Sequence, residues 1–181
     1  MGFWGSFVLA RAEQESLLDL PPVTSRSEGL EEEVRLGDWR LGRFEGPELA
    51  QDAGALLADL VAATGAPALT AFVLDSDAVV VDGLSAAGPW RACLAREAMR
   101  GYCEDDGEDF GIYPSATAAA AAAADWAREA GCTPDEQFLE RVFATDEADL
   151  FAEDLFTSLL QALGLTGPAE GWTTTAGQAT G

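Results

Sequence analysis

Residues 66–85, APALTAFVLDSDAVVVDGLS, decide the fold because they hold two β-rich runs separated by only three residues. The separating residues, Asp75-Ser76-Asp77, carry side chains that bond their own backbone and favour turns. The gap is too short for the crossover that parallel strands require, so the two runs predict an antiparallel hairpin.

Upstream of the hairpin, the sequence predicts two more strands and one helix. Residues 3–10 alternate bulky and small side chains, which is typical of a strand. Residues 25–33, SRSEGLEEE, predict a mobile connection, and residues 38–46, DWRLGRFEG, predict the second strand. Pro47 stands at a first helical position and opens an amphipathic helix, which Gly65 ends.

Downstream of the hairpin, the sequence predicts a series of helices. From Trp90 the chain either continues the sheet briefly or enters a helix, and a helix from about Cys93 is the favoured interpretation. The alanine-rich residues 115–131 predict another helix, because alanine is the best helix former. Residues 133–136, TPDE, read as a capping box with proline at the first helical position. The last helix is expected to begin at Asp146 and to bury Phe151.

This order of elements predicts an α+β domain, a small antiparallel sheet covered by C-terminal helices. One domain is expected over residues 1–165, and the Thr- and Gly-rich residues 166–181 predict a disordered tail. A chain of 181 residues is long enough to bury a core without disulfides. Its three cysteines, Cys93, Cys103 and Cys132, are odd in number and resemble buried thiols.

The charge of the chain is strongly unbalanced. Thirty-two Asp and Glu residues oppose ten bases, all of them arginine, for a net charge of −22. A GC-rich genome favours Ala, Gly, Arg and Asp over Lys, so part of this pattern has a mutational explanation. Such a surface repels phosphate backbones and anionic lipids, so we expect no nucleic-acid or membrane binding and a basic protein partner instead. No signal peptide or long apolar segment appears, which predicts a cytoplasmic location.

Missing residue types exclude much of enzyme chemistry. Without histidine there is no Ser-His-Asp or Cys-His catalysis, and without lysine there is no P-loop or Schiff base. The mechanisms that remain use paired carboxylates, which act directly or hold a divalent metal ion. FVLDSDAVV resembles the first motif of haloacid-dehalogenase-type phosphatases and the Asp-X-Asp of glycosyltransferases, although those phosphatases also require a lysine. One hypothesis is therefore a divalent-metal-dependent hydrolase or transferase using Asp75, Asp77 and Asp82; the other interpretation is a plain turn.

A second acidic stretch, residues 103–113 (CEDDGEDFGIY), holds five carboxylates around Gly107. When Gly107 is aligned with the invariant glycine of an EF-hand, Tyr102 stands where an acid is required, so the stretch does not match an EF-hand calcium loop. The stretch then reads as a solvated loop or as a docking surface with aromatic anchors. Further along, Asp149 and Glu153 stand four residues apart on the predicted last helix and repel each other. Binding of a basic ligand would remove this repulsion. The predicted partner-binding residues are Tyr102, Glu104, Asp105, Asp106, Glu108, Asp109, Phe110, Tyr113, Asp149 and Glu153.

Residues 1–11 (MGFWGSFVLAR), residues 66–83 and residues 151–165 (FAEDLFTSLLQALGL) together resemble small acidic actinobacterial proteins of uncharacterised function. In size, acidity and α+β character the chain is also similar to immunity proteins that neutralise toxins. The resemblance implies a non-catalytic binding protein, an inhibitor or an assembly subunit, that recognises a basic partner without a cofactor or a metal. A further interpretation is that the acidity only keeps the protein soluble, with an apolar interface elsewhere.

Overall fold

The structure, a computed structural model, describes residues 2–13, 15–27 and 29–165. Six strands form one sheet in the order β2-β3-β1-β4-β5-β6, and every neighbouring pair is antiparallel. The predicted α+β class and the hairpin at its centre are therefore confirmed. The predicted tail, residues 166–181, lies outside the described residues. The strands are β1 (Gly5–Arg11), β2 (Leu30–Leu36), β3 (Trp39–Glu45), β4 (Ala68–Leu74), β5 (Ala78–Ser85) and β6 (Gly88–Leu94).

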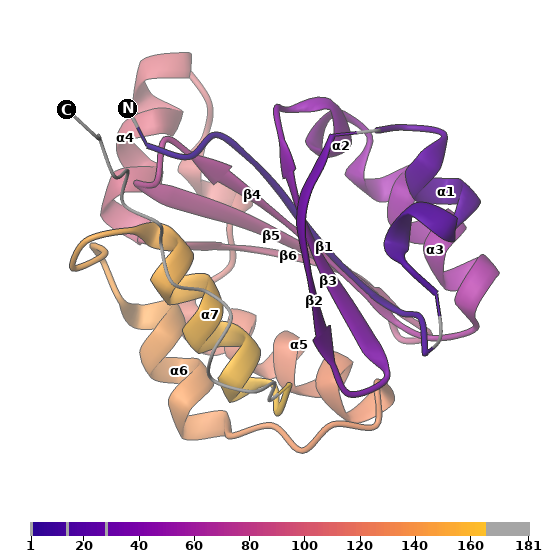
Figure 1. Cartoon of the computed structure of the whole chain (residues 1–181). Helices are drawn as coiled ribbons and strands as arrows, with labels where there is room; N and C mark the ends of the chain where they lie inside the picture. Colours follow the sequence, from indigo (N-terminus) through magenta and orange to yellow (C-terminus); the bar gives the residue numbers. More distant parts are fainter. Residues whose placement is uncertain (1, 14, 28, 166–181) are drawn as a thin grey trace, which may run out of the picture.

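Helices cover both faces of the sheet (Figure 1). The C-terminal helices pack on one face, as predicted. They are α5 (Ala116–Glu129), α6 (Glu136–Ala144) and α7 (Ala152–Ala162). The other face carries elements of the N-terminal half, which the sequence analysis did not predict as a second layer. These are η1 (Leu17–Asp19), α1 (Pro21–Thr24), α2 (Glu48–Gln51) and α3 (Ala53–Thr64).

The two-sided cover explains the strand sequences. In β1, Phe7 and Leu9 face the C-terminal helices, whereas Val8 and Ala10 face α3, and all four side chains are buried. A strand buried on both faces needs apolar side chains at every position rather than at alternate ones. A third, smaller cluster forms where α4 (Arg96–Asp106) and η2 (Phe110–Ile112) pack beside β5 and β6. Within the described residues, no helix is long and apolar enough to cross a membrane.

Large aromatic side chains anchor the main layer. Trp126 is almost fully buried, and its indole N–H donates to the carbonyls of Ala68 (3.1 Å) and Leu84 (3.2 Å), which face each other across β4 and β5. The buried alanines of α5 belong to the same apolar cluster as strand residues such as Leu69 and Val81. Trp4, in contrast, is 43% exposed.

The prediction of a mobile connection over residues 25–33 is wrong in its second half, because β2 begins at Leu30. Four of its seven residues are charged, and apolar alternation is limited to Val34 and Leu36 at its end. Pairing with β3 explains the strand instead: Glu32 stands opposite Arg43, and Glu31 forms an ion pair with the same arginine at 3.4 Å. Opposite charges across two strands stabilise such a pairing.

The helix predicted from about Cys93 begins three residues later, at Arg96. Cys93 belongs to β6, where it is buried and lies opposite Val80. Sheet pairing here overrides the helical preference of the following residues. The helix predicted from Pro47 is also divided, because Asp52 has a non-helical conformation (φ −131°, ψ 34°) between α2 and α3.

Two predicted helix starts are also wrong. Asp135, and not Thr133, caps α6 by accepting a 2.9 Å hydrogen bond from the N–H of Phe138. The last helix begins at Ala152 rather than at Asp146, because the preceding residues run irregularly beside α4. Phe151, predicted to be buried, is 40% exposed.

Candidate partner-binding groove

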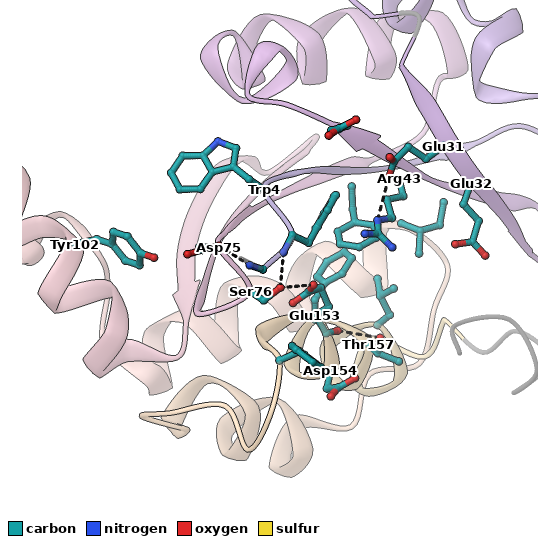
Figure 2. A pocket seen from close by; sticks show the side chains of 18 residues that line it. Trp4, Glu31, Glu32, Arg43, Asp75, Ser76, Tyr102, Glu153, Asp154 and Thr157 are labelled. Atoms are coloured by element: carbon teal, nitrogen blue, oxygen red, sulfur yellow. Dashed lines mark hydrogen bonds and ion pairs between the residues drawn. The ribbon is translucent and has the colours of Figure 1, made fainter. Parts of the chain in front are cut away.

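A cavity of about 920 Å³ opens between α7 and the β2 side of the sheet (Figure 2). Its lining comes from the N-terminal segment, β2, β3, the turn between β4 and β5, α4 and α7. Apolar side chains form the floor, including Leu41 and Phe156. Six carboxylates and one arginine, Arg43, are the charged groups of this lining. We name the cavity the acidic groove; its carboxylates are Glu31, Glu32, Glu45, Asp75, Glu153 and Asp154.

Arg43 crosses the groove without neutralising it. Its guanidinium lies 3.9 Å from the centre of the Phe3 ring, and its Nε lies 3.4 Å from Glu31. A cation held over an aromatic face and beside a carboxylate is already occupied by two partners. One positive charge against six negative ones leaves the groove with a net charge of −5.

Ser76 holds the wall of the groove together. It adopts a left-handed conformation, with φ of 62°, in the tight turn between β4 and β5. Its hydroxyl accepts from the N–H of Phe3 at 2.7 Å and donates to Glu153 Oε1 at 2.8 Å. Its main chain bonds Phe3 and Ala152 as well, so the turn joins the N-terminal segment to the start of α7.

Glu153 carries an unbalanced charge into the groove wall. Its Oε1 accepts from Ser76, whereas its buried Oε2 has no hydrogen-bond partner among the described residues. A carboxylate oxygen that is shielded from water and lacks a donor is costly, and a cation or an N–H group would remove this cost.

Two aromatic side chains stand at the mouth of the groove. Trp4 is 43% exposed and packs edge-on against Phe72, with ring centres 5.5 Å apart. The hydroxyl of Tyr102 lies 3.3 Å from Asp77 Oδ2. Burial, with the charge of Asp77 beside it, raises the pKa of Tyr102, so this side chain remains a neutral donor. An exposed tryptophan beside carboxylates suits the recognition of a cation.

The structure divides the predicted partner-binding residues. Tyr102 and Glu153 line the acidic groove, and Asp149 is exposed in the segment before α7. The others lie outside the groove. The exposed acids of the last turn of α4 and the loop after it are Glu104, Asp105, Asp106, Glu108 and Asp109.

The aromatic residues of that acidic stretch already have partners in the chain. Arg96 and Arg100 lie 5.1 Å and 4.8 Å from the ring centre of Phe110, which also contacts Tyr113. Burial raises the pKa of Tyr113 to about 12. Because internal contacts hold both rings, the groove with its exposed Trp4 offers the better anchor.

The three aspartates of the metal hypothesis have separate roles. Asp75 accepts from the N–H of Gly2 at 2.6 Å, and Asp77 contacts Tyr102. Asp82 lies five residues further along β5 and forms a two-point pair with Arg91, at 2.7 Å and 3.2 Å. Among the described residues, no group of three His, Cys, Asp or Glu side chains is arranged to hold a metal ion.

A second cavity of about 280 Å³ lies on the opposite face of the sheet, between α2 and the Asp82–Arg91 pair. Ser6 lines it, is 1% exposed, and has no hydrogen-bond partner for its hydroxyl among the described residues. This cavity has about a third of the volume of the acidic groove, and its aspartate is neutralised by Arg91. It therefore offers fewer charged groups for the recognition of a ligand.

Sequence reasoning missed most of the groove. Trp4, Arg43 and Asp154 come from three elements that are far apart in the chain, and the acids of β2 were read as part of a connection. The only available signal was the acidic run before Val34. Comparison with protein-family models, with curated proteins and with solved structures found no match.

Proposed function

We propose that this chain is a non-catalytic binding protein that recognises a basic segment of a partner protein through the acidic groove. The observation that carries the proposal is the set of six carboxylates against one arginine around an apolar floor, with Trp4 exposed at the mouth. Complementary charge of this kind raises association rates and excludes wrong partners. An aromatic anchor adds binding energy at the centre of such a surface.

The particular role that fits is that of an inhibitor, an immunity-type protein or an assembly subunit. Nucleic acids and anionic membranes do not suit a groove of this charge, since both present phosphates. The three cysteines are free thiols, in keeping with a cytoplasmic protein. The metal-dependent alternative has less support, because Arg91 already engages Asp82 and the three aspartates serve different contacts.

The test compares two triple variants that remove the same charge. One neutralises the groove (Glu31→Gln, Glu32→Gln, Asp154→Asn), and the other neutralises the end of α4 (Glu104→Gln, Asp105→Asn, Glu108→Gln). Binding of a labelled arginine-rich peptide is followed by fluorescence anisotropy at low and high salt. We expect the groove variant to raise Kd about tenfold or more, because nearby carboxylates are lost, and added salt to weaken wild-type binding.

The α4 variant serves as the control for net charge. We expect it to change Kd by about twofold at most, since long-range charge is screened within roughly 8–10 Å at physiological salt. An equal increase in Kd for the two variants would mean that the peptide responds only to the net charge of the protein. The groove would then not be the binding site. No binding by the wild type would overturn the proposal altogether.

A further inference from the structure

The strand β2 is an open edge of the sheet beside the acidic groove. Among the described strands it pairs only with β3, and most of its seven residues are exposed or half-buried. An edge strand presents unpaired N–H and C=O groups that can template a further strand. Glu31 and Glu32 belong both to this strand and to the groove lining.

The register of the hairpin shows which groups face outward. A two-residue turn, Gly37-Asp38, joins β2 to β3, with Leu36 opposite Trp39. Such a turn is closed by a hydrogen-bonded pair, and bonded and non-bonded pairs alternate from it. The main-chain groups of Glu33 and Arg35 therefore point away from β3. No main-chain bond from another described element reaches them.

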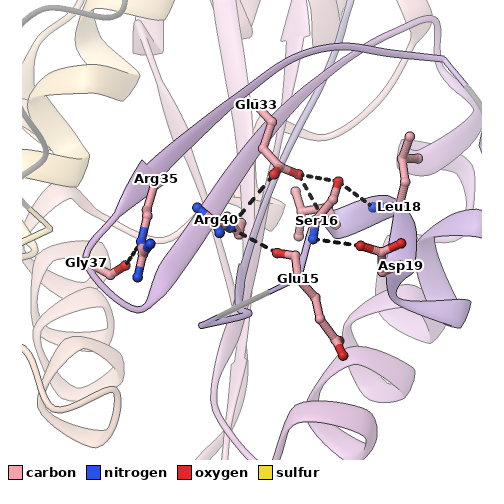
Figure 3. A network of polar contacts seen from close by, with 9 residues as sticks. Glu15, Ser16, Leu18, Asp19, Glu33, Arg35, Gly37 and Arg40 are labelled. Carbon is pink, nitrogen blue, oxygen red and sulfur yellow. Dashed lines mark hydrogen bonds and ion pairs between the residues drawn. The ribbon is translucent and has the colours of Figure 1, made fainter.

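The two faces of β2 differ in chemistry. On the face away from the groove, Glu33 is committed within the chain: its Oε2 accepts from Ser16 Oγ at 2.9 Å and from the N–H of Leu17 at 2.7 Å, and Arg40 lies beside it (Figure 3). Arg35 on the same face is exposed. On the groove side, Glu32 is exposed and makes no ion pair with the described residues.

These charges select the occupant of the edge. A second copy of this chain carries the same net charge of −22 and its own acidic groove, and repulsion between the two copies disfavours pairing of their β2 edges. A strand with basic side chains facing the groove would meet Glu32 and the other groove carboxylates. On the opposite face, Arg35 repels a basic side chain, so basic residues are favoured at alternate positions only.

We propose that β2 accepts an extended basic segment of the partner protein as a seventh strand, with basic side chains at alternate positions turned into the acidic groove. This inference rests on the proposed function and adds the mode of binding. Main-chain hydrogen bonds to Glu33 and Arg35 supply affinity. Ion pairs between the groove carboxylates and the basic side chains at alternate positions supply specificity.

The test uses a synthetic peptide, Val-Arg-Val-Arg-Val-Arg-Val, and two versions methylated on their backbone nitrogens. One version is methylated at the last three valines and the other at the three arginines, so the two versions carry the same charge and the same number of methyl groups. In an antiparallel pair, directly opposite residues point to the same face, so the N–H groups that reach β2 belong to the valines. We expect methylation at the valines to raise Kd about tenfold or more and methylation at the arginines to be tolerated.

The other outcomes each decide a question. A loss confined to arginine methylation would mean that the strand adds in parallel, which still supports the seventh strand. Equal binding by all three peptides, with the groove variant still impaired, would overturn strand addition and leave the proposed function standing. Failure of the unmethylated peptide to bind would overturn both.

A matched pair of protein variants adds a second readout. Glu32→Gln removes a carboxylate beside the added strand, whereas Glu140→Gln removes an exposed carboxylate on α6, away from the groove. We expect Glu32→Gln alone to weaken the peptide, by roughly two- to fivefold, in the range of a single cross-strand charge pair. Equal effects of the two variants would contradict the placement of the basic side chains.

Discussion

The hydroxyl of Ser76 donates a 2.8 Å hydrogen bond to Glu153 Oε1, which joins the turn between β4 and β5 to the first turn of α7. The two residues are 77 positions apart in the chain. The same hydroxyl accepts from the N–H of Phe3, so one small side chain fixes three segments of the groove wall.

Ser76→Ala is therefore expected to destabilise the protein by about 1–3 kcal/mol, because it leaves the Glu153 carboxylate without its donor. Urea unfolding followed by circular dichroism measures this loss. Ser158→Ala is the control, since its hydroxyl bonds only a carbonyl of its own helix; a change within about 0.5 kcal/mol is expected there. Similar losses in both variants would contradict the role given to Ser76.

Trp126→Phe is expected to cost about 2–3 kcal/mol. The substitution removes the N–H that bonds Ala68 and Leu84 and leaves a small cavity under α5. Trp4→Phe should change stability by less than about 0.5 kcal/mol, because Trp4 is 43% exposed. Thermal unfolding of the two variants provides the comparison, and a larger loss for Trp4→Phe would be inconsistent with this packing.

Two glycines with open space around them should respond in opposite directions to alanine. Gly101 lies inside α4 with no atom near its missing Cβ, so Gly101→Ala is expected to stabilise the protein by about 0.5–1 kcal/mol. Gly65 has φ of +66° at the end of α3, and Gly65→Ala should destabilise by about 1 kcal/mol. Chemical denaturation measures both, and changes of the same sign would show that backbone conformation does not decide the outcome.

Stability is expected to fall as the pH rises from about 9 to 12. Burial raises the pKa of Cys93 from its ordinary value of 9.0 to about 11 and that of Tyr113 from 10.0 to about 12. The unfolded chain releases these protons first, so increasing pH favours the unfolded state in this window. Below pH 9 both groups stay protonated in both states, and their contribution is constant.

Urea midpoints at pH 8 and pH 10.5 test this dependence. Tyr113→Phe keeps the ring contact with Phe110 and removes one titrating group, so its midpoint should fall less than that of the wild type over the same interval. An unchanged pH dependence in this variant would rule out Tyr113 as a source of the effect.

The parts of the fold that local sequence determines were predictable. The turn residues Asp75-Ser76-Asp77 form the predicted hairpin, and the alanine-rich stretch forms the predicted helix, which Ser115 caps. Elements that depend on distant partners were not. The strand β2 has apolar alternation only at Val34 and Leu36, and its charged half forms a strand because it pairs with β3. Helix-forming residues after Cys93 obscured the end of β6 in the sequence.

The candidate site was predictable only in its chemistry. The excess of carboxylates indicated a basic partner, and Tyr102 and Glu153 were among the expected residues. No local pattern indicates that Trp4, Glu32 and Asp154 meet across one groove, because the sheet order brings them together. The most conspicuous acidic run, at the end of α4, instead lies outside the groove.

The place of β1 between β3 and β4 has a consequence for synthesis on the ribosome. The first strand to emerge is the central one, yet its partner β4 ends 69 residues after β1 begins, at Leu74 compared with Gly5. β3 emerges earlier and can cover one edge of β1, but at about 5–20 residues per second the other edge waits several seconds for β4. A chaperone that binds emerging chains would find an apolar target in Phe7, Val8 and Leu9.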